Sequence, residues 1–118
     1  MLMNEAQIII QIVSEYYNIP IDVLKTGKRK IENIKAIHIM WYFCKIHTEM
    51  RYKDIAELMC RNSHCDIVHA VKSVKNQVQT NKTYRDEVYE LTDRINKTLY
   101  PKTYAKNYMY YKIMSISN

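Results

Sequence analysis

The sequence predicts an all-α protein of about five to six helices packed around one long central helix. Its 118 residues, 47% of them hydrophobic, are enough to bury a single core without metal ions or disulfides. One glycine and two prolines in the whole chain leave few of the turns that β-hairpins need. Apolar residues instead recur at intervals of three and four in several stretches, which is the spacing of one face of a helix.

The first helix is expected to begin after Asn4, whose side chain can cap it together with Gln7 three residues later. Its apolar face is formed by Ile9, Ile12, Val13 and Tyr16. The segment 18–20 ends this helix, because Pro20 cannot continue the hydrogen-bond ladder and holds the preceding residue extended. Residues 21–25 are then expected to form one short helical turn.

Residues 26–30, with the sequence TGKRK, are expected to form a flexible basic loop. Gly27 supplies backbone freedom. Lys28, Arg29 and Lys30 are consecutive cations, an arrangement that solvent tolerates and that phosphate groups favour.

Residues 31–48 are expected to form the longest and most apolar helix. Its apolar positions are Ile34, Ile37, Met40, Trp41, Phe43, Cys44 and His47. A helix that is apolar over most of its girth is a central one, wrapped by its neighbours. Trp41 and Phe43 are the best candidates for the bulk of the core. His38 and His47 are expected to be ordinary core or surface histidines with no catalytic or ligand-binding role.

Residues 51–77 are predicted to form two short helices separated by a tight polar turn at residues 60–62. The first buries Tyr52, Ile55, Ala56 and Met59, and the second buries Ile67, Val68, Val71, Val74 and Val78. Helices this close in sequence cannot lie side by side over much length, so they are expected to cross steeply, as in a helix-turn-helix. The second, over about residues 63–78, has an outward face that carries His64, Cys65, His69, Lys72 and Asn76.

Ser63 and Asp66 begin this second helix and have the spacing of a capping pair, with Ser63 as the N-cap residue. A carboxylate in the first turn also meets the positive end of the helix dipole. Capping is therefore the alternative to base contact for both residues.

Residues 82–99 are expected to form the last helix, whose apolar face is Tyr84, Val88, Leu91 and Ile95. We therefore divide the chain into a domain of residues 1–99 and an extension of residues 100–118. The extension holds five of the eleven tyrosines, several lysines and no acidic residue. In order of preference, it is a packed extra helix, an oligomerisation arm, or a strip that stacks on nucleic acid.

The net charge of +6 and a pI near 9.2 favour a polyanionic partner. The charge is also unevenly distributed. Residues 25–53 contain eight basic and two acidic residues, whereas residues 83–95 contain four acidic and two basic ones. This asymmetry is what a directed nucleic-acid surface requires, and the alternative is an ordinary solvated surface.

Several kinds of chemistry are not expected. A single glycine excludes the known glycine-rich nucleotide motifs, so we expect neither a nucleotide nor another cofactor. Cys60, His64, Cys65 and His69 suggest zinc, but His64 and Cys65 would point about 100° apart on a helix, so no metal site is expected. Cys65 with His69 lacks an orienting group and oxyanion donors, so we expect no catalytic residues and no enzyme.

The three cysteines are expected to be reduced thiols of a cytoplasmic protein. No stretch resembles a secretion signal. No window approaches the roughly 18 apolar residues of a membrane span, so no membrane partner is expected.

Residues 61–71, RNSHCDIVHAV, resemble the signature at the C-terminus of the bacterial replication initiator DnaA, Gly-Arg-Asp-His-Thr-Thr-Val-Leu-His-Ala. The preceding YKDIAELM resembles that family's Leu-Pro-Glu-Ile-Gly-x-x-Phe. Upstream, IIIQIVSEYYNIPIDVLKTGKRK is similar to its first helix, short second helix and basic loop. The resemblance covers about residues 8–95 and leaves the tail outside.

The resemblance implies a helix-turn-helix of the Trp-repressor-like type that binds double-stranded, A/T-rich nonamer boxes. In that family the recognition helix enters the major groove, and an arginine of the basic loop reaches the minor groove. It also implies a free-standing domain in replication initiation or its regulation, encoded on a mobile element, in the cytoplasm of a bacterial host and associated with the nucleoid. The DNA-binding residues expected are Lys28, Arg29, Lys30, Lys45, Arg51, Lys53, Asn62, Ser63, His64, Cys65, Asp66, His69 and Lys72.

The signature also departs from the family's pattern. Asn62 replaces Arg, Ser63 replaces Asp, and Cys65 and Asp66 replace two Thr, while residues 60–61 replace glycines of the turn. Each lost base contact typically costs about 1–3 kcal/mol of discrimination. The alternative function is therefore a non-catalytic adaptor that keeps the fold and has lost specific DNA binding. It would form a homodimer or bind a replication protein, through the C-terminal tail.

Overall fold

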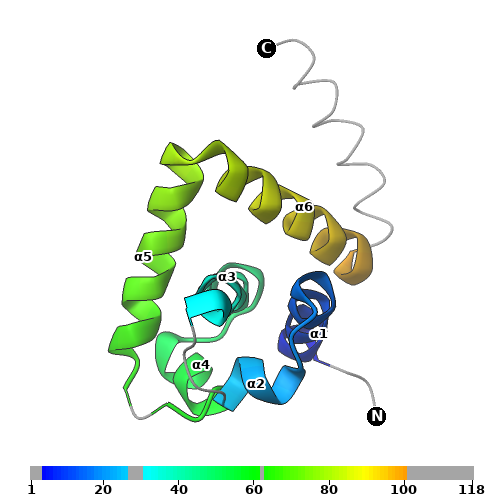
Figure 1. Ribbon diagram of the computed structural model, residues 1–118. Helices are drawn as coiled ribbons and strands as arrows, with labels where there is room; N and C mark the ends of the chain where they lie inside the picture. Colours follow the sequence, from blue (N-terminus) through cyan, green and yellow to red (C-terminus); the bar gives the residue numbers. More distant parts are fainter. Residues whose placement is uncertain (1–3, 27–30, 62, 101–118) are drawn as a thin grey trace.

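The computed structural model describes residues 4–26, 31–61 and 63–100. Within these ranges the chain forms six helices and no strand, which confirms the all-α prediction (Figure 1). The helices are α1 (Glu5–Tyr17), α2 (Ile21–Thr26), α3 (Ile31–His47), α4 (Tyr52–Leu58), α5 (Cys65–Thr80) and α6 (Lys82–Leu99). Across these ranges, none of the helices has the length and apolar character needed to cross a lipid bilayer.

Helix α3 occupies the centre of the fold. It contacts α1, α2, α4 and α5, and Figure 1 shows it nearly end-on with the other helices around it. Helix α6 packs against α1 and α5 and so closes the ring. The predicted central position of this helix is confirmed.

The expectation that this central helix is also the longest is wrong. Among the described helices, α3 has 17 residues and α6 has 18. Helix α3 ends at His47, and the hydroxyl of Thr48 just beyond it accepts the N–H of Met50 at 3.1 Å. Helix α6 continues to Leu99, and its C-cap residue is Tyr100, which precedes Pro101.

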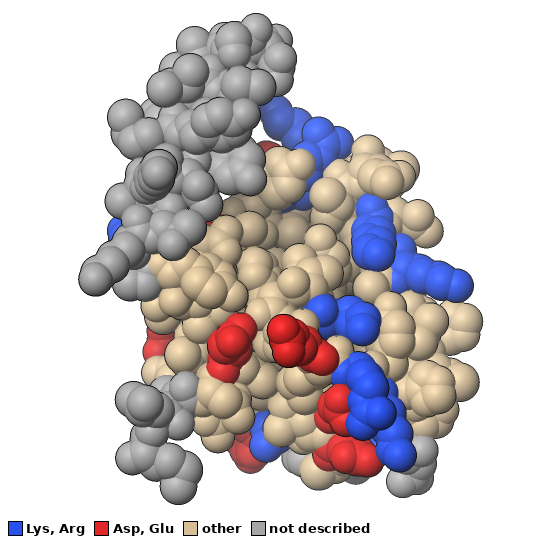
Figure 2. All heavy atoms as spheres, turned by 180° about the vertical axis from the view of Figure 1, so that it is seen from behind, with Lys and Arg blue, Asp and Glu red and all other residues tan. Residues whose placement is uncertain are grey.

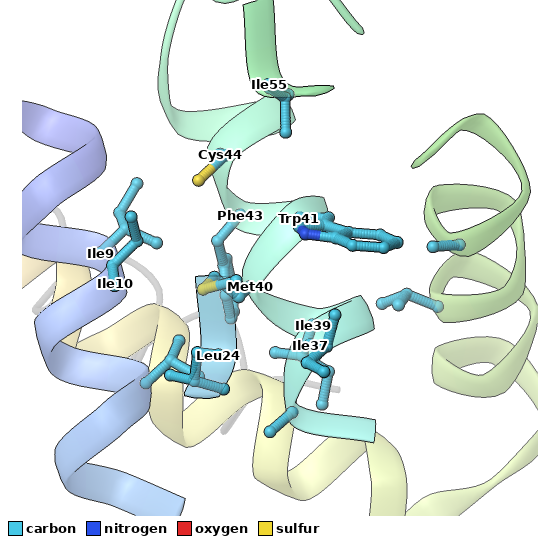
Figure 3. Packing of buried hydrophobic residues seen from close by; sticks show 14 of the residues in the cluster. Ile9, Ile10, Leu24, Ile37, Ile39, Met40, Trp41, Phe43, Cys44 and Ile55 are labelled. Carbon is cyan, nitrogen blue, oxygen red and sulfur yellow. The ribbon is translucent and has the colours of Figure 1, made fainter. Parts of the chain in front are cut away.

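The core forms around α3, as its apolar girth predicts. Trp41 and Phe43 are the largest of the fully buried side chains. In Figure 3 the Trp41 ring points from α3 toward α5, while Ile9 and Ile10 approach α3 from α1. Burial raises the pKa of the Cys44 thiol to about 12, so this cysteine is an inert core residue.

The start of α1 confirms the predicted capping box. The side chain of Asn4 accepts the backbone N–H of Gln7 at 2.9 Å, and the Gln7 side chain accepts the backbone N–H of Asn4 at 3.0 Å. The helix ends at Asn18, which adopts a left-handed conformation with φ of 56°. Asparagine tolerates this conformation, so the helix already ends two residues before Pro20.

A single residue joins α5 to α6. The backbone N–H of Asn81 donates to the Gln77 carbonyl at 2.8 Å, and its side chain accepts the N–H of Tyr84 at 3.1 Å. Arg85 also donates from Nε to the Val78 carbonyl at 2.8 Å. Asn81 therefore ends one helix and caps the next.

Candidate nucleic-acid interface

Helix α4 ends in a hydrogen-bonded turn that leads to α5. The N–H of Arg61 donates to the Ala56 carbonyl at 2.8 Å, and the N–H of Cys60 donates to the Glu57 carbonyl at 3.2 Å. Cys60 has a φ of 57°, in the left-handed region. These two bonds and the left-handed residue together make a Schellman motif, in which glycine is the usual residue at the position of Cys60.

Helix α5 begins at Cys65, two residues later than predicted, and continues to Thr80. Two amide groups of its first turn, those of Ile67 and Val68, donate to the His64 carbonyl at 3.1 Å. The hydroxyl of Ser63 accepts the N–H of Cys65 at 3.2 Å. Ser63 therefore satisfies one free donor of the first turn. The N-cap residue, however, is His64, whose side chain makes no capping hydrogen bond, so the prediction of Ser63 as the N-cap is wrong.

The two faces of α5 are sharply different. The inner face is buried and consists of Ile67, Ala70, Val71 and Val74. The outer face is exposed and includes His64, Cys65, Asp66, His69, Lys72 and Asn76. The predicted outward orientation of these side chains is confirmed. We call the exposed residues Cys65, His69, Lys72 and Asn76, which follow one another at helical spacing, the α5 strip.

Sequence reasoning missed several exposed residues of α5, among them Ser73 and Lys75. Both adjoin the α5 strip, and Lys75 adds a second cation three residues after Lys72. Helical periodicity, applied to the whole helix, would have found both.

Three cations predicted to flank the DNA backbone have different surroundings. Lys45 is half-buried, with Nζ 3.4 Å from the Met50 carbonyl oxygen and 4.6 Å from the centre of the Tyr52 ring. It therefore holds the connection between α3 and α4. Lys53, in the first turn of α4, is exposed.

Arg51, just before α4, is exposed and paired. Its Nε and Nη2 donate to the two carboxylate oxygens of Asp54, each at 3.1 Å. This hydrogen bonding raises the pKa of Arg51 and lowers the pKa of Asp54. A phosphate that binds Arg51 must therefore compete with a carboxylate already in contact with it.

Four predicted site residues, Lys28, Arg29, Lys30 and Asn62, lie outside the described residues. The neighbouring elements are described. Helix α2, which precedes the basic segment, lies at the same end of the molecule as α4 and the start of α5 (Figure 1). In the view from behind, Lys and Arg side chains are scattered down the right half of the face, the side on which α5 lies, with Asp and Glu side chains among them at the lower end (Figure 2).

The helix-turn-helix family of the bacterial DnaA protein matches residues 6–74. These residues include α1 to α4, the turn and the first ten residues of α5. The match therefore covers more than half of the chain and contains the start of the α5 strip.

Curated relatives agree with this match. The chromosomal replication initiator protein DnaA of Bacteroides thetaiotaomicron is 27% identical over 89 residues, which are 75% of this chain and 19% of the relative. The protein of the same name from Flavobacterium psychrophilum is 30% identical over 89 residues, 75% of this chain and 18% of the relative. The protein of the same name from Corynebacterium aurimucosum is 26% identical over 90 residues, which are 76% of this chain and 16% of the relative.

The aligned part of the chain spans less than a fifth of the length of these relatives. The predicted resemblance is confirmed by both comparisons. From the fold, the turn geometry and the match over residues 6–74, this chain belongs to the family of bacterial DnaA helix-turn-helix domains.

Proposed function

We propose that this chain is a non-catalytic protein that binds double-stranded DNA in replication initiation or its regulation. Helix α5 enters the major groove, and the basic segment 26–30 lies against the minor groove and the phosphates. The observation that carries this proposal is the α5 strip, a row of exposed polar side chains on a helix whose other face is buried. Family membership and the name of the relatives, chromosomal replication initiator protein, support the same function.

The geometry of α5 suits this role. A helix fits the width of the major groove, and recognition helices contact base edges with residues of their N-terminal turns. His64 and Cys65 are exposed there. Lys53, Lys72 and Lys75 are exposed cations that would contact phosphates and fix the register on the duplex.

We propose a sequence preference that differs from that of the relatives. Ser63, Cys65 and Asp66 stand at positions where the family signature has other side chains, and all three are exposed. Ser63 is in addition engaged by the backbone N–H of Cys65. Base contacts would then come chiefly from His64, Cys65 and His69.

A fluorescence-anisotropy titration tests this function. A labelled duplex with A/T-rich nonamer boxes is compared with a scrambled duplex of the same composition at several salt concentrations. We expect binding to both, with a steep decrease in affinity as salt rises and a preference for one sequence. Absence of binding at low salt would contradict the proposal, and binding without preference would reduce it to electrostatic association.

A second candidate function is an adaptor that binds protein. Asp66 is exposed in the first turn of α5, where a phosphate would be repelled by a carboxylate, and this observation favours it. In this case residues 1–99 form the domain, and the extension 100–118 binds either a second copy of this chain or a replication protein. Size-exclusion chromatography with light scattering, on the full chain and on residues 1–99, measures whether a dimer depends on the extension.

A further inference from the structure

Arg61 makes a contact that neither the charge pattern nor the family match suggests. Its guanidinium carbon lies 5.4 Å from the centre of the Trp41 ring. Its backbone N–H is bonded to the Ala56 carbonyl at 2.8 Å, in the Schellman motif that ends α4. Both the backbone and the side chain of Arg61 are therefore held.

Arg61 is only partly exposed, and the burial of its Nε atom calls for a compensating interaction. Its Nε is buried and has no hydrogen-bond partner among the described residues. Leaving a charged donor without water or a partner is unfavourable. The face of an indole attracts a guanidinium, and the attraction grows as water is removed, so Trp41 supplies the compensation.

The two residues connect the turn to the core. Trp41 is fully buried and points from α3 toward α5 (Figure 3). Arg61 belongs to the turn that precedes α5. An arginine side chain thus reaches back from the helix-turn-helix to the central helix, at a position where the resembling family has glycine and so has no side chain to make this contact.

We infer that Arg61 is a positioning residue: its contact with Trp41 holds the turn against α3 and fixes the direction in which α5 leaves it. Through this contact Arg61 sets the orientation of His64 and Cys65 toward DNA without binding phosphate itself. This inference rests on the proposed function.

The contact can be tested on the free protein. Trp41 is the only tryptophan, so its fluorescence reports its surroundings alone. We expect Arg61→Met to change the Trp41 emission and to speed hydrogen exchange of the amides of Arg61 and Cys65. Arg61→Lys, which keeps a cation, should restore part of both. The control is Arg94→Ala. Arg94, on α6, makes a contact of the same kind away from the turn, because its guanidinium carbon lies 5.1 Å from the centre of the Tyr16 ring on α1. Unchanged emission and exchange in Arg61→Met would overturn the inference.

The salt dependence of DNA binding separates positioning from direct phosphate contact. We expect Arg61→Met to weaken binding by roughly 3- to 30-fold, comparable with the loss of a partly desolvated cation–π contact. The slope of log affinity against log salt should not change. A slope reduced by about one would instead identify Arg61 as a phosphate contact and overturn the inference. If the unaltered protein binds no DNA, the proposed function fails, whereas the fluorescence and exchange results still decide whether the contact holds the turn.

Discussion

The hydroxyl of Tyr17 in α1 donates a hydrogen bond to Oε2 of Glu87 in α6 at 2.9 Å. The same carboxylate oxygen lies 2.7 Å from Nζ of Lys35 in α3. Burial and the bond to Glu87 raise the pKa of Tyr17, and burial and the Glu87 charge raise the pKa of Tyr84 to about 12. One carboxylate therefore connects three helices that are far apart in the sequence.

Replacing Glu87 should destabilise the fold. In Glu87→Ala the half-buried Tyr17 hydroxyl loses its acceptor, so we expect the free energy of unfolding to fall by about 1–3 kcal/mol. Urea unfolding followed by circular dichroism measures this change. Glu90→Ala is the matched control, since Glu90 pairs with Arg94 at 3.3 Å on the exposed surface, and it should change stability by less than about 0.5 kcal/mol. Equal effects of the two substitutions would contradict the role given to Glu87.

Replacing Cys60 by glycine should stabilise the protein. Cys60 takes the left-handed conformation of a Schellman motif, which disfavours any residue with a Cβ atom. We expect Cys60→Gly to raise the free energy of unfolding by about 1 kcal/mol, measured in the same urea experiment.

Asn18→Gly is the control for this substitution. Asn18 has a similar φ of 56°, but asparagine tolerates it well, so the gain should be clearly smaller. A loss of stability in Cys60→Gly would show that the thiol contributes more than the backbone conformation costs.

The faces of the helices could be predicted from the sequence, whereas the contacts between distant residues could not. The burial of Ile55, Ala56 and Met59 follows from their spacing of three and four residues along the chain, so helical periodicity is enough to predict it. The contact between Arg61 and Trp41 depends on the packing of α3 against the turn, which no local pattern encodes.

The candidate interface shows the same division. The exposure of His69 and Lys72 follows from helical spacing, as predicted. Lys45 could not be understood in this way, because its contacts with Met50 and Tyr52 arise only when α4 folds back on the end of α3. The start of α5 was placed too early, because the spacing of Ser63 and Asp66 indicated Ser63 as the N-cap, whereas the N-cap residue in the structure is His64.

His47 should make stability depend on pH. It is half-buried, and burial lowers its pKa although the charge of Glu5 acts in the opposite direction. The unfolded chain, with a histidine pKa near 6.5, therefore binds a proton at a higher pH than the folded chain does. We expect the free energy of unfolding to be nearly constant between about pH 7 and 8 and to fall as the pH drops below about 6.5.

Unfolding curves across this pH range measure the effect. His47→Gln should flatten the pH dependence between the folded and unfolded values of the histidine pKa. His69→Gln, which changes an exposed histidine, should leave it unaltered. If His69→Gln removed the dependence and His47→Gln did not, the assignment to His47 would be wrong.

The basic segment should contribute to affinity without contributing to sequence preference. Replacing Lys28, Arg29 and Lys30 by alanine should weaken binding to every duplex and reduce the salt slope by up to about three, one for each lost phosphate contact. Anisotropy titrations at several salt concentrations measure both quantities. The control removes the same charge from α6 by replacing Lys82, Arg94 and Lys97, which are exposed. Unchanged affinity in the first variant would mean that the DNA surface lies elsewhere.

Asn81 is both the C-cap of α5 and the N-cap of α6, so it fixes how α6 is rotated about its own axis relative to α5. One inserted residue would turn α6 by about 100° about its axis relative to α5. Val88, Leu91 and Ile95 would then leave the core, and the charged side of α6 would face it. The length of the chain at this joint is therefore set by the core, and any change in the number of residues has to fall elsewhere.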